Sequence, residues 1–433
     1  MTIMSIQQFA NELGRATRAM NENRWSDAIT DLSIVHERTP DNIEAAGKLA
    51  FALSRDGRYR DAVDVLEKLH SRQPEEPKWP YMIGYQYYEK KAWKEAIHWF
   101  EKALKVRPGY IKVLYRMGYA HVALAQENEA INALTDCIKY WERAASDAQE
   151  RDRSIYSKAQ FQLGKLLLSK GLSRKAARHL EIAVRIDHQN HDFLYELGQC
   201  HLRNNLLDEA LSALEAADRI KPGTDYIIDR IAQTYARKGE YATAERIYER
   251  IPEHRRRHFV SQHLGMMYVD WGQHEKAIPH LQAALRKQPD NHNIHYALGC
   301  AQEAMGQVRK AHASYTRAID HRRTKFNLAF KEAEEALKRT SELLEESKSD
   351  EETENSNVGV VESYDDARGF GFINTNSHDR IFFHISKFVG AQKPRRGSSV
   401  VFSSENSPKG LRAVHVELIS GNDTLTSKTQ NQQ

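Results

Sequence analysis

Small residues flanked by apolar ones recur at a nearly constant spacing through the first three quarters of the chain. Their separations are 34, 34, 46, 34, 34, 33 and 34 positions, and each is followed about twelve positions later by an alanine. Two helices that cross closely need small residues at their contact, and this period accommodates two helices with their turns. The pattern therefore predicts a stack of helical pairs. The recurring small residues are Ala50, Gly84, Gly118, Gly164, Gly198, Ala232, Gly265 and Gly299.

The ends of these units are marked as well. Most units close with a proline, which prevents a helix from continuing: Pro40, Pro74, Pro108, Pro222 and Pro289. Counting a degenerate first unit, we expect nine units between residues 9 and 324. The one long interval predicts an insertion around residues 141–154, whose composition favours longer helices over an added loop.

Three shorter segments follow or flank the main regions. Residues 325–347 carry leucines and alanines on or near one helical stripe, which predicts a helix that caps the last unit. Residues 348–356 are acidic and polar, a composition typical of a linker. Residues 421–433 are expected to form a disordered tail.

Near the C-terminus the period changes from that of a helix to that of a strand. Arg368, Phe370 and Phe372 fall on one face of a predicted strand, and Phe382 and His384 fall on one face of the next. A nucleic-acid base covers exposed rings well, because every base has a π-face. The alternative is an ordinary half-buried pair of strands.

These two motifs, 368–373 and 381–386, resemble the ribonucleoprotein-type motifs of the cold-shock domain. That family folds as a small all-β barrel of the OB type and binds single-stranded RNA or DNA. The resemblance covers about residues 357–420. It implies that bases stack on Tyr364, Phe370, Phe372, Phe382 and His384.

The sequence departs from the cold-shock pattern at three positions. Ser363 replaces a stacking tryptophan, Glu362 replaces a lysine, and Ile385 replaces a ring. A reversed charge and two lost rings predict weaker binding of nucleic acid.

The helical units resemble the tetratricopeptide repeat, a 34-residue helix-turn-helix unit. The resemblance implies that the first helix of each unit lines a groove in which a protein segment docks. Rings interleaved with lysines on such a groove are also suited to stacking bases, and the rings can instead pack between neighbouring helices. The groove positions are Lys78, Tyr81, Tyr85, Tyr88, Lys112, Tyr115, Tyr119, Lys158, Phe161, Lys165, Tyr195 and Arg203.

Composition adds little beyond this. The 433 residues carry 63 Lys and Arg against 59 Asp and Glu, a net charge of +4 that does not itself indicate a polyanionic partner. No apolar run reaches the ~18 residues that a membrane span needs, so we expect a cytoplasmic protein. His292 and His295 are three positions apart, but no third ligand accompanies them, and we expect neither a metal nor another cofactor.

The sequence therefore predicts a mainly α protein, a tetratricopeptide α-solenoid followed by a small all-β barrel. No catalytic constellation is found, so an enzyme is not expected. The predicted function is a non-catalytic adaptor whose barrel binds single-stranded RNA or DNA and whose solenoid binds an unidentified protein. The alternative is a protein-assembly scaffold whose barrel has lost nucleic-acid binding.

Overall fold

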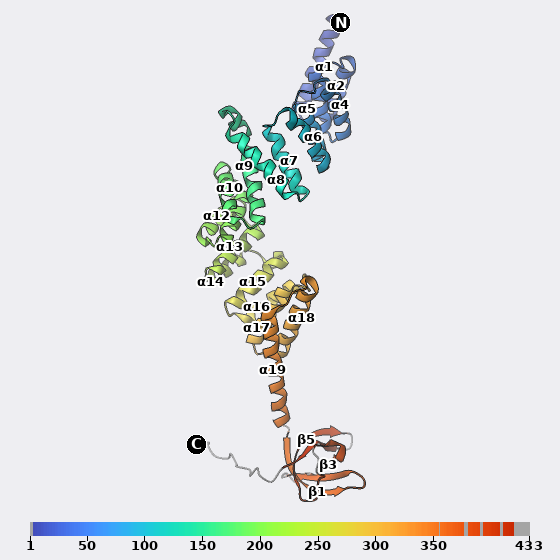
Figure 1. Ribbon diagram of the computed structural model, residues 1–433, viewed down its shortest axis with the longest axis vertical. Coiled ribbons are helices and arrows are strands. Elements are labelled where there is room, and N and C mark those ends of the chain that lie inside the picture. The colour runs from blue at the N-terminus through green and yellow to red at the C-terminus, as the bar shows by residue number, and fades with distance from the viewer. Residues whose placement is uncertain (1–2, 355, 376–379, 390–392, 408–409, 420–433) are drawn as a thin grey trace. The chain divides into compact units, whose positions relative to one another are not determined.

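The computed structural model describes residues 3–354, 356–375, 380–389, 393–407 and 410–419. Its internal contacts divide the chain into two compact units, Met1–Arg256 and Arg257–Gln433. The first unit is helical, and the second combines helices with a sheet (Figure 1).

Helices of the first unit pack as consecutive pairs, each joined by a short turn. The pairs are α1 (Ile3–Asn21) with α2 (Trp25–Arg38), α3 (Ile43–Arg55) with α4 (Tyr59–Arg72), α5 (Lys78–Glu89) with α6 (Trp93–Val106), α7 (Ile111–Ala123) with α8 (Glu127–Glu142), α9 (Ser146–Ser169) with α10 (Ser173–Ile186), α11 (His191–Arg203) with α12 (Leu207–Ile220), and α13 (Asp225–Arg237) with α14 (Tyr241–Glu249). The 3₁₀ turn η1 (Glu253–Arg255) follows.

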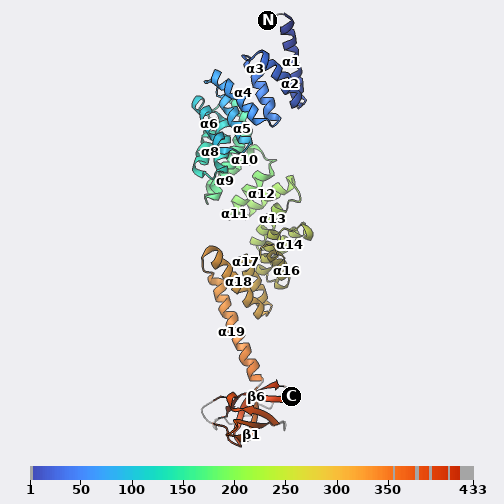
Figure 2. The same cartoon turned by 90° about the vertical axis from the view of Figure 1, so that its right-hand side faces the viewer.

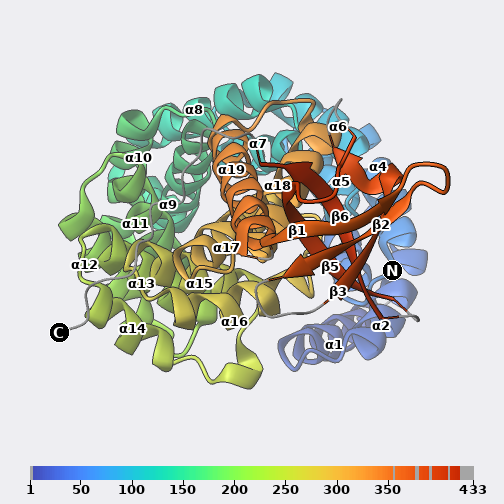
Figure 3. The same cartoon turned by 90° about the horizontal axis from the view of Figure 1, so that it is seen from below.

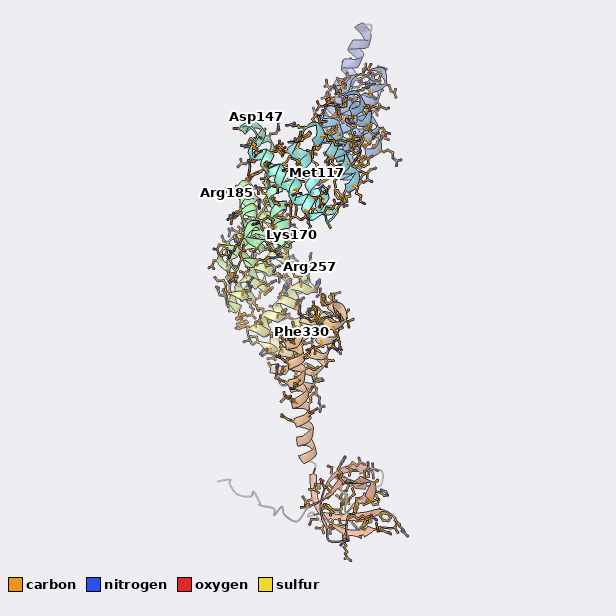
Figure 4. The ribbon with its side chains drawn as sticks, in the orientation of Figure 1. Met117, Asp147, Lys170, Arg185, Arg257 and Phe330 are labelled. Carbon is orange, nitrogen blue, oxygen red and sulfur yellow. The ribbon has the colours of Figure 1, made fainter. Side chains whose placement is uncertain are left out.

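Two further pairs and a single helix belong to the second unit: α15 (His258–Asp270) with α16 (His274–Leu285), α17 (His292–Ala304) with α18 (Val308–Phe326), and α19 (Lys331–Glu354). Phe330, labelled in Figure 4, is buried against Ala318 and Ile319 of α18 and so anchors the start of α19. Helix α19 packs along α18, as expected of a capping helix (Figure 2).

The recurring glycines lie at the contact within each pair, which is why the repeat requires them. A Cβ atom on Gly198 would lie 2.6 Å from Cγ of Leu214, and one on Gly164 would lie 2.8 Å from Cγ of Leu180. Real Cβ atoms do not approach that closely, so a larger residue would push the two helices apart. The predicted helical pairs are therefore confirmed.

The long interval in the repeat lengthens helices, as expected. Helix α8 has 16 residues and α9 has 24. The Trp141 ring stacks on Tyr156 with 3.7 Å between the ring centres, and Trp141 Nε1 donates a hydrogen bond to the Gln149 carbonyl at 3.0 Å. These contacts fasten the additional turns of α9 to the end of α8.

Helix α19 differs from the expected boundaries at both ends. Asn327 has a left-handed φ of 52°, which ends α18, and α19 then begins at Lys331 rather than at 325. It continues to Glu354, through most of the segment 348–356 in which the sequence favours a linker. Glutamate and lysine are good helix formers, and neither Gly nor Pro interrupts the chain from Lys331 to Val358. An acidic, polar composition alone therefore did not predict the helix end.

The sheet of the second unit closes into a barrel (Figure 3). The strand order is β3-β2-β1-β5-β6-β4, and an additional pairing of β3 with β6 completes the ring. Its core is apolar: Val361, Ile373, Ile381, Phe383, Val400, Phe402, Ala413 and Val416. The strands are β1 (Ser356–Asp365), β2 (Phe370–Thr375), β3 (Arg380–His384), β4 (Phe388–Val389), β5 (Ser399–Ser407) and β6 (Gly410–Leu418), with the 3₁₀ turn η2 (Ile385–Lys387). The predicted fold class, an α-solenoid followed by a small β-barrel, is confirmed.

Candidate nucleic-acid interface and partner groove

Four predicted stacking residues lie together on the outer surface of β2 and β3. Phe370 pairs with His384 and Phe372 pairs with Phe382 in the antiparallel register. Directly opposite residues share a face, so all four side chains point away from the core. The Phe382 ring centre is 5.8 Å from those of both Phe370 and Phe372. We call Phe370, Phe372, Phe382 and His384 the ring face.

The ring face is accessible to a ligand. Phe382 is 37% exposed, His384 is exposed, and the other two rings are half-buried. The Ser386 backbone N–H donates to His384 Nδ1 at 3.2 Å, which leaves Nε2 as the nitrogen that carries the proton in the neutral ring. His384 can therefore present both a π-face and a hydrogen-bond donor.

Two other predicted residues lie apart from the ring face. Tyr364 pairs with Gly371 on the inward side of β1, and its ring packs parallel to buried Phe383 with 6.0 Å between centres. Arg368 lies in the turn before β2, where its side chain is 3.6 Å from a carboxylate oxygen of Asp365. The structure thus brings together four of the six predicted nucleic-acid residues.

An ion pair fixes the turn beside Tyr364. Lys393 Nζ donates to Asp366 at 2.6 Å, and this hydrogen bond holds the pKa of Asp366 below its ordinary value. The Tyr364 hydroxyl donates to the same carboxylate at 3.4 Å. Tyr364 is therefore held by Phe383 through its ring and by Asp366 through its hydroxyl.

The departures from the cold-shock pattern lie next to the ring face. Ser363 pairs with Phe372, so it occupies the position from which a tryptophan would extend the rings. Glu362 lies at an irregularity of β1 and accepts a hydrogen bond from Arg380 Nε at 2.7 Å. Arg380, which the sequence analysis missed, has its guanidinium carbon 4.2 Å from the Phe372 ring centre. Its signal was the alternation Arg380, Phe382, His384 along β3.

The groove tyrosines of α5 and α7 form a continuous ring network. Tyr81 lies 5.2 Å from Tyr110, Tyr85 stacks on Tyr88 at 6.3 Å, and Tyr88 lies 5.8 Å from Tyr119, all between ring centres. Tyr119 is 36% exposed. These rings contact one another between neighbouring helices. The same side chains could therefore serve the packing of the helices or the binding of a partner.

The network contains a cation that the sequence analysis missed. The Arg116 guanidinium lies 4.8 Å from the Tyr85 ring centre and 5.5 Å from that of Tyr81. Arg116 is one helical turn after Lys112, which was the available signal. Burial raises the pKa of Tyr81 and Tyr115, so these phenols stay neutral.

A hollow of about 950 Å³ opens beside this network. It is lined by aromatic and charged residues that include Phe51, Trp79, Tyr81, Tyr85, Tyr110, Lys48, Lys78, Lys112, Arg55, Glu44 and Glu76. Lys48 is paired with Glu44 at 2.7 Å, and Lys112 lies 3.9 Å from Asp152. Within the described part of the chain, Lys78 and Arg116 have no carboxylate within 4.0 Å. The hollow therefore combines apolar rings with four basic and two acidic side chains, and Arg116 lies beside it over Tyr85.

The predicted groove residues further along the chain are tied to neighbouring helices. Phe161 is only 9% exposed and stacks on Phe193 with 4.4 Å between centres. Tyr195 meets Tyr226 edge-on at 4.8 Å. Phe161 is thus largely unavailable, while the hollow gathers Lys78, Tyr81, Tyr85 and Lys112 at one place.

Neither a metal centre nor a membrane helix emerges from the residues that the structure describes. Those residues contain no group of three His, Cys, Asp or Glu placed to hold a metal ion. His295 Nε2 instead hydrogen-bonds to the Pro289 carbonyl at 2.7 Å. The described helices include none long and apolar enough to cross a membrane.

Comparison with known protein families matches both regions. Residues 357–419 match the 'Cold-shock' DNA-binding domain. Residues 161–224 match a tetratricopeptide repeat, residues 265–306 match a TPR repeat, and residues 55–137 match anaphase-promoting complex, cyclosome, subunit 3.

Known relatives cover the barrel. Cold shock protein CapB of Pseudomonas syringae is 33% identical over 67 residues, which are 15% of this chain and 97% of that protein. Major cold shock protein CspA of Pseudomonas aeruginosa is 35% identical over 63 residues, 14% of this chain and 91% of that protein.

Similarity to solved structures is low, both in sequence and in TM-score. YrrB, a TPR protein with an unusual peptide-binding site, is 18% identical, with a TM-score of 0.38 over 43% of this chain and 89% of that one. MamA is 23% identical, with a TM-score of 0.35 over 39% of this chain and 91% of that one.

The repeat architecture rests on the helical pairs and on the family matches. The cold-shock domain suggests nucleic-acid binding, and the repeats suggest interaction with protein. Through residues 357–419 the chain belongs to the cold-shock domain family, and its helical pairs make it a tetratricopeptide-repeat protein as well.

Proposed function

We propose that this protein is a non-catalytic adaptor that binds single-stranded RNA or DNA through the barrel and a protein partner through the solenoid groove. In this proposal the solenoid spans residues 9–324 and the nucleic-acid-binding domain spans 357–420. The observation that carries the proposal is the ring face, four π-systems gathered on the accessible side of β2 and β3.

Base stacking gives a function to rings that lie outside an already filled barrel core. A cross-strand ring pair contributes about 0.2–1 kcal/mol to a sheet, whereas stacking contributes about 1–3 kcal/mol for each base. Stacking alone tolerates many sequences, so we expect shallow sequence preference. Ser363 adds no ring opposite Phe372, so we also expect modest affinity.

The hollow beside α5 and α7 supports a protein partner with carboxylates and at least one apolar anchor. Tyr81 and Tyr85 offer rings with few rotatable bonds, so they are ordered on binding at small entropic cost. Lys78 on its lining supplies positive charge, and Arg116 adds a second cation beside it, 4.8 Å from the Tyr85 ring centre. Two modest contacts on one chain strengthen each other through effective concentration when both ligands belong to one complex.

The rival function is a scaffold whose barrel docks protein. Glu362 favours it, because a carboxylate beside the rings opposes the phosphates of a nucleic acid. The ring face opposes it. Affinity for a single-stranded oligonucleotide separates the two.

The barrel is tested by titrating the full chain with a labelled single-stranded pyrimidine oligonucleotide. Phe370→Ala and Phe382→Ala should each weaken binding by about 1–3 kcal/mol, because each removes one stacking surface. Phe326→Ala is the matched control, since Phe326 is 49% exposed on α18 and belongs to neither predicted site. Parent-like binding by both ring-face variants would refute the stacking proposal.

The groove is tested by affinity capture of partners on the full chain, with and without ribonuclease. The double variant Tyr85→Ala with Tyr119→Ala should release a partner that ribonuclease does not release. Tyr140→Ala is the control, because Tyr140 is exposed to a similar degree on α8. A large fall in melting temperature in the double variant would instead identify these rings as helix packing and would remove the groove site.

A further inference from the structure

Three side chains from three adjacent strands form one layered arrangement at the edge of the ring face. Phe372 of β2 lies beneath the Arg380 guanidinium of β3, with 4.2 Å between the guanidinium carbon and the ring centre. Arg380 Nε donates to Glu362 Oε2 of β1 at 2.7 Å. The guanidinium is therefore held in place from below by the ring and from the side by the carboxylate.

The outer side of the guanidinium remains open to solvent. The Arg380 side chain is 57% exposed and the Glu362 side chain is 41% exposed. Arg380, Phe382 and His384 alternate with the buried residues Ile381 and Phe383, so all three point outward in one row along β3. Arg380 thus continues the row of stacking surfaces rather than standing apart from it.

The short side chain of Ser363 makes room for this arrangement. Ser363 pairs directly with Phe372, and Glu362 lies where β1 shifts its register. A lone carboxylate at this position would repel phosphates, but the paired Arg380 guanidinium brings an opposite charge next to it. Ser363 and Glu362 remove the tryptophan and lysine of the cold-shock pattern. Together with Arg380 they leave a different stacking surface, the guanidinium, at the same place.

We infer that the Glu362–Arg380–Phe372 layer is a nucleobase-stacking platform, in which a base lies on the exposed side of the guanidinium. Guanidinium planes stack on bases as aromatic rings do. Glu362 is a positioning residue that orients the plane, while Phe372 supports it from beneath. The inference rests on the proposed binding of single-stranded nucleic acid and moves one stacking position from the Phe372 ring to the guanidinium that lies over it.

The test compares Arg380→Lys and Arg380→Gln in the full chain, with a single-stranded oligouridylate as the probe. Lysine keeps the positive charge but has no flat surface, so both variants should lose about tenfold in affinity. Lys393→Gln is the control, because it removes the same charge from another exposed ion pair, with Asp366 at 2.6 Å. It should bind within about threefold of the parent, the size of one lost phosphate contact at moderate salt.

Two results would overturn the inference. Parent-like binding by Arg380→Lys with weak binding by Arg380→Gln would show that only the charge acts. Tighter binding by Arg380→Gln would show that Arg380 covers Phe372 and competes with a base. In either case Phe370→Ala and Phe382→Ala would still weaken binding; if these variants also bind like the parent, the proposed function itself fails. A circular dichroism spectrum of each variant establishes that it is folded.

Discussion

The solenoid and the barrel use aromatic rings in opposite ways. In the groove, Tyr81 and Tyr88 contact rings outside their own helix, and Tyr85 contacts both of them within α5, so this network contributes to the packing of the repeats. On the barrel, Phe370 and Phe382 lie outside a core that is already filled by other residues. A substitution on the barrel can therefore remove binding without removing stability, whereas in the groove the melting temperature of a variant decides whether its ring serves packing or binding.

The two regions also differ in how far along the chain their contacts reach. Each glycine of the solenoid repeat meets a side chain of the next helix, as Gly198 meets Leu214. The barrel instead joins β1 to β5 and β3 to β6, strands that are distant in sequence. A repeat array distributes the effect of a local defect, but a small closed barrel depends on every strand.

The largest expected effect tests this contrast. Gly371→Ala should destabilise the barrel by about 3 kcal/mol, because the new Cβ would lie 2.3 Å from the Ser363 carbonyl oxygen and 2.7 Å from the Phe383 ring. Hydrogen exchange of residues 357–419 should accelerate. Fluorescence of the six tryptophans, all between residues 25 and 271, should report an unchanged solenoid. Equal changes in both signals would contradict the separation of the two regions.

A binding change of about 1–3 kcal/mol should follow from restoring the missing ring. In a chain that carries Arg380→Gln, the further substitution Ser363→Trp places an indole opposite Phe372, where it adds a stacking surface without competing with the guanidinium. Titration with a single-stranded pyrimidine oligonucleotide should give tighter binding than Arg380→Gln alone, with little change in its dependence on salt. Unchanged affinity would place the nucleic-acid contact on another surface.

The sequence predicted the periodic features well because each depends on local spacing. Gly164, Gly198 and the strand residues Phe370 and Phe372 were all placed correctly from the period of their element. It did not predict that Tyr364 packs on Phe383, because that contact depends on the barrel closing around the core.

Contacts between elements were harder to foresee than positions within one. Arg380 of β3 donates a hydrogen bond to Glu362 of β1, and Arg116 of α7 lies over the Tyr85 ring of α5. The sequence treated Glu362 only as a lost lysine, since its partner is eighteen positions away. The end of α19 was missed because an acidic composition is compatible with both a helix and a linker.

A smaller effect is expected from pH, and mainly in the solenoid. Burial lowers the pKa of six solenoid histidines: His36, His70, His179, His201, His292 and His295. A lowered pKa means that the unfolded chain binds more protons as the pH falls below about 6.5. The six histidines therefore do not lower the free energy of unfolding above that pH, and they lower it increasingly as the pH falls toward 5. Thermal melting followed by circular dichroism at 222 nm should show this decrease, and a flat profile would contradict it.

A matched variant locates the pH effect. His179 Nδ1 lies 2.6 Å from Gln160 Oε1, so His179→Gln removes a titrating group at a defined contact and should make the profile shallower. All six histidines lie in helices, so hydrogen exchange of the helices should accelerate as the pH falls toward 5.

The smallest expected effect separates two kinds of glycine within the solenoid. Gly14 lies in α1, and the space around the position that its Cβ would occupy is open to 4 Å, so Gly14→Ala should stabilise the protein by about 0.5–1 kcal/mol through the lower entropy of the unfolded chain. Gly198→Ala, the matched substitution at a helix contact, should destabilise it, because its Cβ would lie 2.6 Å from Leu214. Urea unfolding followed by circular dichroism measures both. If the two substitutions shift stability in the same direction, the close approach of paired helices is not what the repeated glycines provide.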